Sequence, residues 1–411
     1  ELVWLDGMFT RGKSITVEDG IIISIGETTS SEMGTGFLPG FVNTHSHAFQ
    51  RGLRGKGEKY CEAGDNSFWG WRDEMYKLVK QLSIESFRGH CVQSFTEMRG
   101  AGITTVGEFH YLHHNLDQDF AFDQTVLEAA SEVGIRIVLL QACYMHGGFG
   151  VSLAEEQQRF ATPEIDIWWE HVDALVNHVD GVMQRVGAVA HSVRAVDIDT
   201  LIAITGGALH RGMPMHIHVE EQRQEITACV ERYGKTPMAL LCEELDVTPM
   251  MTAVHCTHTA AKDMDQWIGQ GGNVCLCPLT EANLADGICD LNRVLKNDGC
   301  LSLGTDSNLR ISMIEEMRWM EYVQRLVQEK RGVCVNASGD SASYLIDAAT
   351  INGARSLGIP AGSIEVGKYA DFTVIDLTHP QLDGFTSETL AAAICYGADN
   401  SIITRTIVGG E

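Results

Sequence analysis

Eight short runs of apolar, mostly β-branched residues recur along the middle of the chain, and helix-like segments separate them. The runs cover residues 40–44, 103–109, 135–142, 187–190, 213–219, 250–254, 273–277 and 301–304. Intervening segments such as 83–99, 124–133 and 167–182 carry apolar residues at three- and four-residue spacing, which is typical of helices. Eight strand–helix units in about 320 residues predict an α/β fold, a (β/α)8 TIM barrel.

The two ends of the chain differ from its middle. Residues 1–37 contain short strand-like segments separated by turns, and segments 362–376 and 401–408 return to this pattern. Because both ends have the same character and flank the barrel, we expect them to pair with each other. The sequence therefore predicts a small β-sandwich domain made of residues 1–37 and 360–411, beside a barrel domain of residues 38–359.

Acidic residues clearly outnumber basic ones. The 411 residues include 30 Lys+Arg and 55 Asp+Glu, which gives a formal net charge of −25. Nucleic acids and anionic membranes bind basic protein surfaces, so neither is expected as a partner. A small anionic substrate is still compatible with this charge, because salt screens distant charges beyond about 8–10 Å and a few local arginines can dominate.

The cysteines and the length of the apolar stretches indicate the cellular compartment of the protein. The twelve cysteines are scattered, with no Cys-x-x-Cys pair. A chain this long lies outside the small disulfide-stapled class, and free cysteine in an apolar run behaves as a small hydrophobe. The longest apolar stretches are much shorter than the roughly 20 residues that a membrane span needs. We therefore expect a cytoplasmic protein that has no membrane partner.

The sharpest local signal is a His-x-His motif at the end of the first predicted strand, His45-Ser46-His47. Side chains alternate along a strand, so residues two apart lie on the same face. His45 and His47 can therefore point at one metal ion. Alone, the motif is weak, since solvated or hydrogen-bonded core histidines give the same pattern.

Other strand ends supply matching residues. The fifth run leads into His216-Ile217-His218, the sixth is followed by His255 and the eighth by Asp306. The carboxyl ends of barrel strands meet on one face, where active sites are built. His45, His47, His218 and Asp306 would offer three imidazoles and a carboxylate, a set that suits one divalent ion, most simply Zn²⁺, with a position left for water. His216 shares a face with His218 but is the less favoured ligand.

In this order, the motifs resemble the one-metal deaminase branch of the amidohydrolase superfamily. Its signature is His-x-His after strand one, His-x-x-Glu after strand five, His after strand six and Asp after strand eight, and all four are present. The fourth predicted strand ends in Ala190-His191-Ser192, without the bridging lysine of two-metal members. The resemblance therefore implies a single ion.

Longer motifs narrow the resemblance to the formimidoylglutamate deiminase family. They are HSHAFQR at 45–51, FWGWR at 68–72, EFHYLHH at 108–114, HSVRAV at 191–196 and TEANL at 280–284. One departure is Glu220, where the family usually has a small residue. The resemblance implies metal-dependent hydrolysis of N-formimino-L-glutamate to N-formyl-L-glutamate and ammonia, a step of histidine degradation.

The same resemblance implies roles for individual residues. Asp306 would take a proton from water, His255 would hydrogen-bond the attacking oxygen, and Glu221 would protonate the imine nitrogen. The implied substrate contacts are Gln50, Arg72, Tyr111, His191 and Arg194. Three nearby histidines, His110, His113 and His114, are interpreted as a wall of the pocket.

Two other functions are weighed against this one. A deaminase of a purine or pyrimidine-type ring would use the same metal site, but Arg72 and Arg194 favour a substrate with two carboxylates. Either arginine could instead be a structural ion-pair partner. A metal-free barrel that acts as a binding or assembly protein would have lost ligands, and here every ligand position is filled. We also expect a homodimer, as barrels of this kind often pair.

Overall fold

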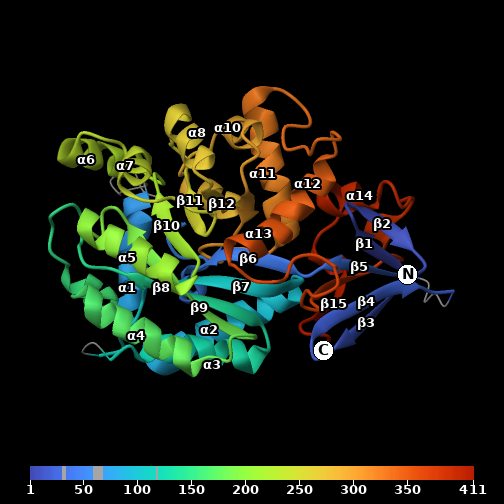
Figure 1. Ribbon diagram of the computed structural model, residues 1–411, viewed down its shortest axis with the longest axis horizontal. Helices are drawn as coiled ribbons and strands as arrows, with labels where there is room; N and C mark the ends of the chain where they lie inside the picture. Colours follow the sequence, from blue (N-terminus) through green and yellow to red (C-terminus); the bar gives the residue numbers. More distant parts are fainter. Residues whose placement is uncertain (30–33, 59–67, 117–118) are drawn as a thin grey trace.

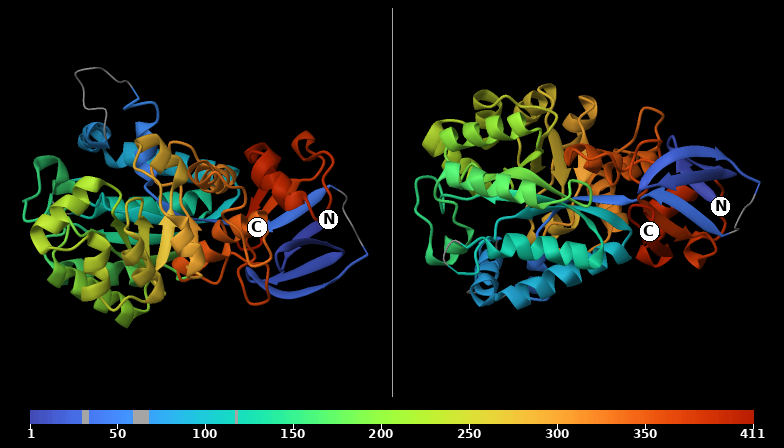
Figure 2. Two further views of the ribbon diagram at one scale, coloured as in Figure 1. Left: turned by 90° about the horizontal axis from the view of Figure 1, so that it is seen from above. Right: turned by 60° about the horizontal axis from the view of Figure 1, so that its bottom comes forward.

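The computed structural model describes residues 1–29, 34–58, 68–116 and 119–411. Figure 1 shows a large barrel, with a smaller group of strands at one end that holds both termini. The same arrangement is seen in the two turned views of Figure 2. Among the described residues, no helix is both long and apolar enough to cross a membrane.

Eight parallel strands form the barrel. They are β6 (Phe41–Ser46), β7 (Ile103–His110), β8 (Arg136–Cys143), β9 (Gln184–Ser192), β10 (Met215–Val219), β11 (Met251–His255), β12 (Asn273–Leu276) and β13 (Leu301–Leu303). Each pairs with its sequence neighbour in a parallel register. A parallel bridge between Ser46 and Asp306 brings the two edge strands together. The predicted (β/α)8 barrel is confirmed.

Helices surround this barrel. They are α1 (Phe68–Gln81), α2 (Ile84–Gly100), α3 (Ala121–Val133), α4 (Ile165–His178), α5 (Ile198–Arg211), α6 (Arg223–Tyr233), α7 (Pro237–Glu244), α8 (Ala261–Gly269), α9 (Pro278–Leu284), α10 (Leu291–Lys296), α11 (Met313–Gln328), α12 (Ser341–Ala348) and α13 (Ile351–Ser356). Helix α2 shows why they form. Ser83 caps its first turn, and Phe87, Cys91, Phe95 and Met98 recur at helical spacing on the buried face.

The strands of both chain ends share one sheet. Its order is β15 (Ile403–Ile407), β14 (Phe372–Asp376), β5 (Thr35–Pro39), β1 (Leu2–Leu5) and β2 (Met8–Arg11). A hairpin of β3 (Lys13–Glu18) and β4 (Ile21–Glu27) packs on it, because Ile22 shares a small core with Val3 and Phe372. The predicted pairing of the chain ends is confirmed. The division at residues 37/38 and 359/360 is still our proposal.

A buried ion pair links this terminal domain to the barrel. The Arg136 guanidinium on β8 donates to both carboxylate oxygens of Asp371, over 3.1 and 3.0 Å, and lies 3.7 Å from the ring centroid of Tyr369. Arg136 and Asp371 are both almost fully buried. A bidentate pair of this kind fixes direction as well as distance. It therefore ties the terminal domain to the amino-terminal half of the barrel strand.

Candidate functional site

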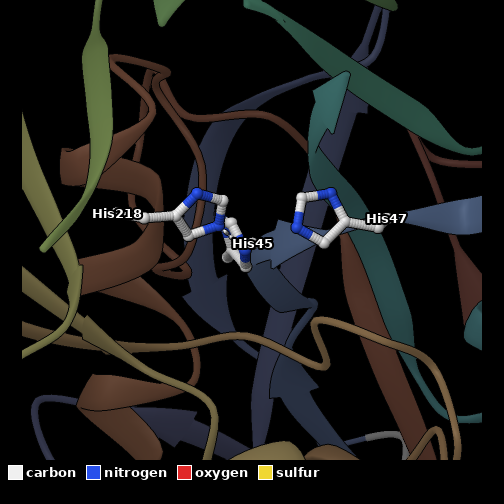
Figure 3. A group of neighbouring side chains, drawn as sticks. All are labelled: His45, His47 and His218. Atoms are coloured by element: carbon white, nitrogen blue, oxygen red, sulfur yellow. Dashed lines mark hydrogen bonds between the residues drawn. The ribbon is translucent and has the colours of Figure 1, made fainter. Parts of the chain in front are cut away.

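Four side chains converge at the carboxyl ends of the barrel strands. His45 Nε2 lies 3.2 Å from His218 Nε2 and 3.4 Å from Asp306 Oδ1, and His47 Nε2 lies 3.3 Å from the same oxygen. Figure 3 shows the three imidazole rings gathered from two strands around a common space. All four side chains are buried. The structure thus brings together the four residues that the sequence singled out as ligands.

Backbone carbonyls orient two of these rings. The Nδ1–H of His47 donates to the carbonyl of Phe109 over 2.7 Å, and the Nδ1–H of His218 donates to that of His191 over 3.0 Å. Each Nε2 lone pair therefore faces the common space. Burial lowers the pKa of His47 to about 3 and also lowers the pKa values of His45 and His218, so the rings are neutral. Neutral imidazole is the form that binds a metal.

The four residues fit a divalent ion. Two Nε2 lone pairs that face each other at 3.2 Å repel unless a proton or a cation lies between them. An ion bound tetrahedrally at about 2.0–2.1 Å keeps its ligand atoms about 3.3 Å apart. The observed separations of 3.2, 3.3 and 3.4 Å match this spacing. His216 lies apart from the group, since its Nε2–H donates to the carbonyl of Ser356 over 3.1 Å.

Glu221, which follows β10 after His218, and His255, at the end of β11, face the same space. His255 Nε2 lies 3.8 Å from Glu221 Oε1 and 4.0 Å from Asp306 Oδ2. Burial raises the pKa of Glu221 to about 7, so this carboxyl group can hold or release a proton near neutral pH. Burial alone would lower the pKa of His255, but the carboxylates of Glu221, Glu281 and Asp306 raise it well above its usual value.

Backbone strain gathers at these strand ends. The φ values are +54° at Glu220, +73° at His255 and +46° at Asp306. They lie in the left-handed region of backbone conformation, which residues other than glycine rarely adopt. Such conformations persist where the surrounding fold over-determines them, often at functional sites. These backbone conformations occur close to the ends of β11 and β13, where His255 and Asp306 face His45, His47 and His218.

The substrate contacts implied by the sequence share one cavity. Its lining contains Gln50, Arg72, Tyr111, His191 and Arg194, together with His47, His218, Glu221, His255 and Asp306. Fully buried His45 is not in the wall. The Gln50 amide donates to the Tyr111 hydroxyl over 2.8 Å, and the Gln50 carbonyl oxygen is buried without a partner. Gln50 therefore keeps an unused acceptor, and it shares the lining of this cavity with Arg72 and Arg194.

The two arginines differ in their partners. Arg194 Nε lies 3.4 Å from a carboxylate oxygen of Glu225, on α6. The Arg72 guanidinium lies 4.2 Å from the ring centroid of Trp69, and none of the described carboxylates is within ion-pair distance of it. The structural ion pair that the sequence left open therefore exists for Arg194. Arg72 keeps its charge for another partner.

Glu220 points away from the cavity. Its carboxylate accepts the backbone N–H of Met238 over 2.9 Å, in the first turn of α7. Burial raises the pKa of Glu220 to about 7. An acidic group at a helix amino terminus is stabilised by the unpaired N–H groups there. Glu220 therefore supports α7 and adds no second acid to the cavity beside Glu221.

Sequence reasoning missed part of the cavity wall and misread another part. Tyr76, Tyr144 and Phe160 also line the cavity. Tyr144 directly follows β8, so the strand-end rule that found His255 could have found it. The interpretation of His110, His113 and His114 as a pocket wall is wrong, since none of the three lines the cavity. The rings of His110 and His113 bind the buried carboxylate of Asp123, on α3, and the His114 ring hydrogen-bonds the backbone carbonyl of Ala161.

Comparisons with known proteins agree with this geometry. A model described as the amidohydrolase family matches residues 37–411. The formimidoylglutamate deiminase of Pseudomonas aeruginosa is 35% identical over 403 residues, which cover 96% of this chain and 88% of that protein. A 5-methylthioadenosine/S-adenosylhomocysteine deaminase of Natronomonas pharaonis is 26% identical over 404 residues, which cover 96% of this chain and 86% of that protein.

Solved structures show the same fold. An amidohydrolase from Brucella melitensis has a TM-score of 0.92 at 30% identity and covers 100% of this chain and 92% of its own. An adenosine deaminase from Xanthomonas campestris, solved with bound zinc, has a TM-score of 0.82 at 22% identity. The match covers 100% of this chain and 90% of that one. This chain is a hydrolase of carbon–nitrogen bonds and belongs to the amidohydrolase family.

Proposed function

We propose that the protein hydrolyses N-formimino-L-glutamate to N-formyl-L-glutamate and ammonia, a step of histidine degradation. The observation that carries this proposal is the pair of guanidinium groups, Arg72 and Arg194, in the cavity that the metal-ligand cluster also faces. A substrate with two carboxylates and one amidine end matches a cavity whose wall holds two cations and an acid. The 35% identity to a formimidoylglutamate deiminase supports the same substrate.

We propose that one divalent ion, Zn²⁺, is held by His45, His47, His218 and Asp306. When bound, such an ion lowers the pKa of water from 15.7 towards about 7 and so makes hydroxide available at neutral pH. Three neutral imidazoles and one carboxylate are a donor set that zinc accepts. The Nδ1–H bonds of His47 and His218 to backbone carbonyls support this assignment, since metal-bound histidines are commonly fixed in that way.

The protein's own groups then move the protons. Asp306 accepts a proton from the attacking water, and His255 Nε2, which lies 4.0 Å from the Asp306 Oδ2, hydrogen-bonds the oxygen that adds to the amidine carbon. Glu221 donates a proton to the imine nitrogen, which makes the carbon electrophilic and lets ammonia leave. The nitrogen then takes the proton that Asp306 accepted and leaves as ammonia while the carbon–nitrogen bond breaks and the carbonyl forms. The proton released from the added hydroxyl group restores Glu221, so one water yields one formyl product and one ammonia.

Substrate binding is assigned to five residues. We propose that Arg72 and Arg194 bind the two carboxylates, with help from Gln50, Tyr111 and His191. A guanidinium forms two parallel hydrogen bonds to a carboxylate, which gives both affinity and direction. The absence of a carboxylate partner for Arg72 among the described residues supports its role as a clamp.

A second candidate is a deaminase of a purine or pyrimidine-type ring. The aromatic side chains of Tyr76, Tyr144 and Phe160 in the cavity wall favour it, because a planar base can stack on them. The experiment that separates the two is ammonia release from formiminoglutamate, other formimino amino acids, nucleosides and free bases. Release from formiminoglutamate alone supports the first proposal, and release from nucleosides alone replaces it with the second.

We further propose a cytoplasmic homodimer. The eleven described cysteines are free, and nearly all are buried, as a reducing compartment allows. Helix α11 exposes Trp319, Tyr322 and Leu326, which recur at helical spacing and offer an apolar surface to a second copy. Light scattering on the purified protein gives the mass in solution, and a monomer at micromolar concentration would argue against the dimer.

A further inference from the structure

A buried carboxylate lies directly behind His255. Glu281 belongs to α9, which follows β12, and it is 6% exposed. Its Oε1 accepts from His255 Nδ1 over 3.2 Å and from the backbone N–H of Cys277 over 2.8 Å. On the other side of the same ring, Nε2 lies 3.8 Å from Glu221 and 4.0 Å from Asp306. His255 therefore lies between Glu281 and the reacting groups.

This contact places a proton on Nδ1 of His255. An ionised carboxylate only accepts hydrogen bonds, so the His255 nitrogen that faces it carries the proton. Among the described residues, neither Lys nor Arg lies within ion-pair distance of Glu281, and His255 is the side chain that it pairs with. A carboxylate that orients an imidazole from behind is the arrangement found in catalytic triads and around metal sites.

We propose that Glu281 is a positioning residue for the reaction: it holds the His255 ring with Nδ1 protonated and Nε2 directed at the oxygen that adds to the substrate. The inference rests on the proposed function of His255 as the group that hydrogen-bonds this oxygen. Glu281 itself does not line the cavity and touches no substrate in this account.

A purely structural role for Glu281 has to be separated from this one. Cys277 is the residue that precedes the first turn of α9, so Glu281 also satisfies the amino terminus of its own helix. Glu281→Gln keeps an oxygen acceptor for that N–H but removes the negative charge that favours a proton on His255 Nδ1. Glu316 offers a matched control, because its buried carboxylate accepts the N–H of Leu279 in the same helix over 2.9 Å and has no hydrogen bond to His255.

The first test is a double-mutant cycle in kcat. We expect Glu281→Gln to lower kcat by about 10- to 100-fold, the usual cost of losing an orienting partner, with KM changed less than about threefold. Glu316→Gln should leave kcat within about threefold. In a His255→Asn background, Glu281→Gln should change kcat by less than about threefold, because the residue through which it acts is gone. Wild-type kcat in Glu281→Gln, or an equal loss in both backgrounds, would overturn the proposal.

The second test does not depend on turnover. Protein with ¹⁵N-labelled histidine gives an imidazole signal for His255, assigned by its loss in His255→Asn. We expect a protonated Nδ1 in the wild type and in Glu316→Gln, and a changed signal in Glu281→Gln at unchanged metal content. An identical signal in Glu281→Gln would contradict the proposal. If the wild type fails to hydrolyse formiminoglutamate, the proposed substrate is wrong, while this spectrum still decides whether Glu281 orients His255.

Discussion

Two buried clusters in this protein have nearly the same composition but opposite hydrogen-bonding patterns. One, which we call the ligand cluster, is the proposed metal site of His45, His47, His218 and Asp306. The other, which we call the Asp123 cluster, contains Asp123 with His110, His113 and His171. Each has three imidazoles and one carboxylate. Composition alone would make both of them metal sites.

The polar atoms of the Asp123 cluster find their hydrogen-bond partners within the protein. Oxygens of Asp123 lie 3.1, 2.9 and 3.1 Å from ring nitrogens of His110, His113 and His171, and the Gln141 amide donates to the carboxylate over 3.0 Å. His113 Nε2 also lies 2.8 Å from a backbone carbonyl. Within the part of the chain that the structure describes, none of these side chains has a buried polar atom without a partner. The cluster needs no ion to be stable.

The facing ring nitrogens of the ligand cluster do not find such partners within the described residues. Nε2 of His45 and Nε2 of His218 face each other across 3.2 Å, and two lone pairs in this position repel unless a proton or a cation lies between them. Buried polar groups left in this way are costly unless something else binds them. The two clusters therefore differ in the direction of their lone pairs rather than in their number of histidines, and we infer that this direction separates the proposed metal site from a structural network.

Removing a ligand should have the largest effect. His218→Ala takes away one of the four donors, so bound metal and deiminase turnover should both fall to background. His216→Ala is the matched control, because His216 lies two residues before His218 on the same strand but hydrogen-bonds the carbonyl of Ser356. In both variants, elemental analysis measures the bound metal and ammonia release measures the turnover. Equal metal loss in the two variants would show that His218 is not a specific ligand.

Removing the proposed acid should spare the metal. Glu221→Gln keeps the shape of the side chain but cannot pass a proton, so kcat should fall by about 10²-fold or more. Metal content should stay at the wild-type level. Glu220→Gln serves as the control, since Glu220 hydrogen-bonds α7 outside the cavity. Retained turnover in Glu221→Gln, or the same defect in Glu220→Gln, is the outcome that refutes the assignment.

Replacing the proposed clamps should affect specificity. A charge-assisted hydrogen bond contributes about 1.5–3 kcal/mol, so Arg72→Lys and Arg194→Lys should each lower kcat/KM on formiminoglutamate by roughly 10- to 150-fold. Discrimination against analogues that lack a carboxylate should weaken as well. Arg194→Lys should also lower Tm, because Arg194 is paired with Glu225. Wild-type kcat/KM in both variants would move a ring substrate to first place.

A change in the Asp123 cluster should leave metal and chemistry nearly intact. Asp123→Asn breaks a buried ionic network, which typically costs about 3–5 kcal/mol of unfolding free energy. Thermal melting should therefore occur several degrees lower, while metal content stays at the wild-type level. Loss of one metal ion per chain in this variant would show that the cluster is a second metal site.

The same cluster predicts a pH dependence of stability. Burial opposes ionisation of Asp123, but His113 and His110 hold its pKa well below its usual value. The pKa is therefore lower in the folded than in the unfolded chain. The stabilisation is fully present above the unfolded value, near 3.9, and is lost as the pH falls through the folded value. Acid unfolding of Asp123→Asn should be less steep than that of the wild type below about pH 4.

The barrel could be predicted because strands buried on both faces keep continuous apolar runs. The predicted run at 187–190 was too short, since β9 begins at Gln184. Gln184 and Arg185 are polar, yet they pair with Ile137 and Val138 of β8, so the ladder continues beyond the apolar pattern. Element boundaries depend on such pairing, which the local pattern does not carry.

The ligand cluster could be predicted because parallel strands end at one face of the barrel. The contacts of Glu281 and Glu225 could not, although the motif at 280–284 was visible. Both residues lie on helices, and their partners depend on how α9 and α6 pack against the strand ends. Helical periodicity predicts which face is buried but not which side chain it meets.

Metal stoichiometry tests the central claim most directly. Elemental analysis of the purified wild type, His218→Ala and Asp123→Asn counts the ions per chain in each. The account predicts about one ion in the wild type, about one in Asp123→Asn and close to none in His218→Ala. Two ions in the wild type, with one lost in Asp123→Asn, would contradict the claim that lone-pair direction separates the two clusters.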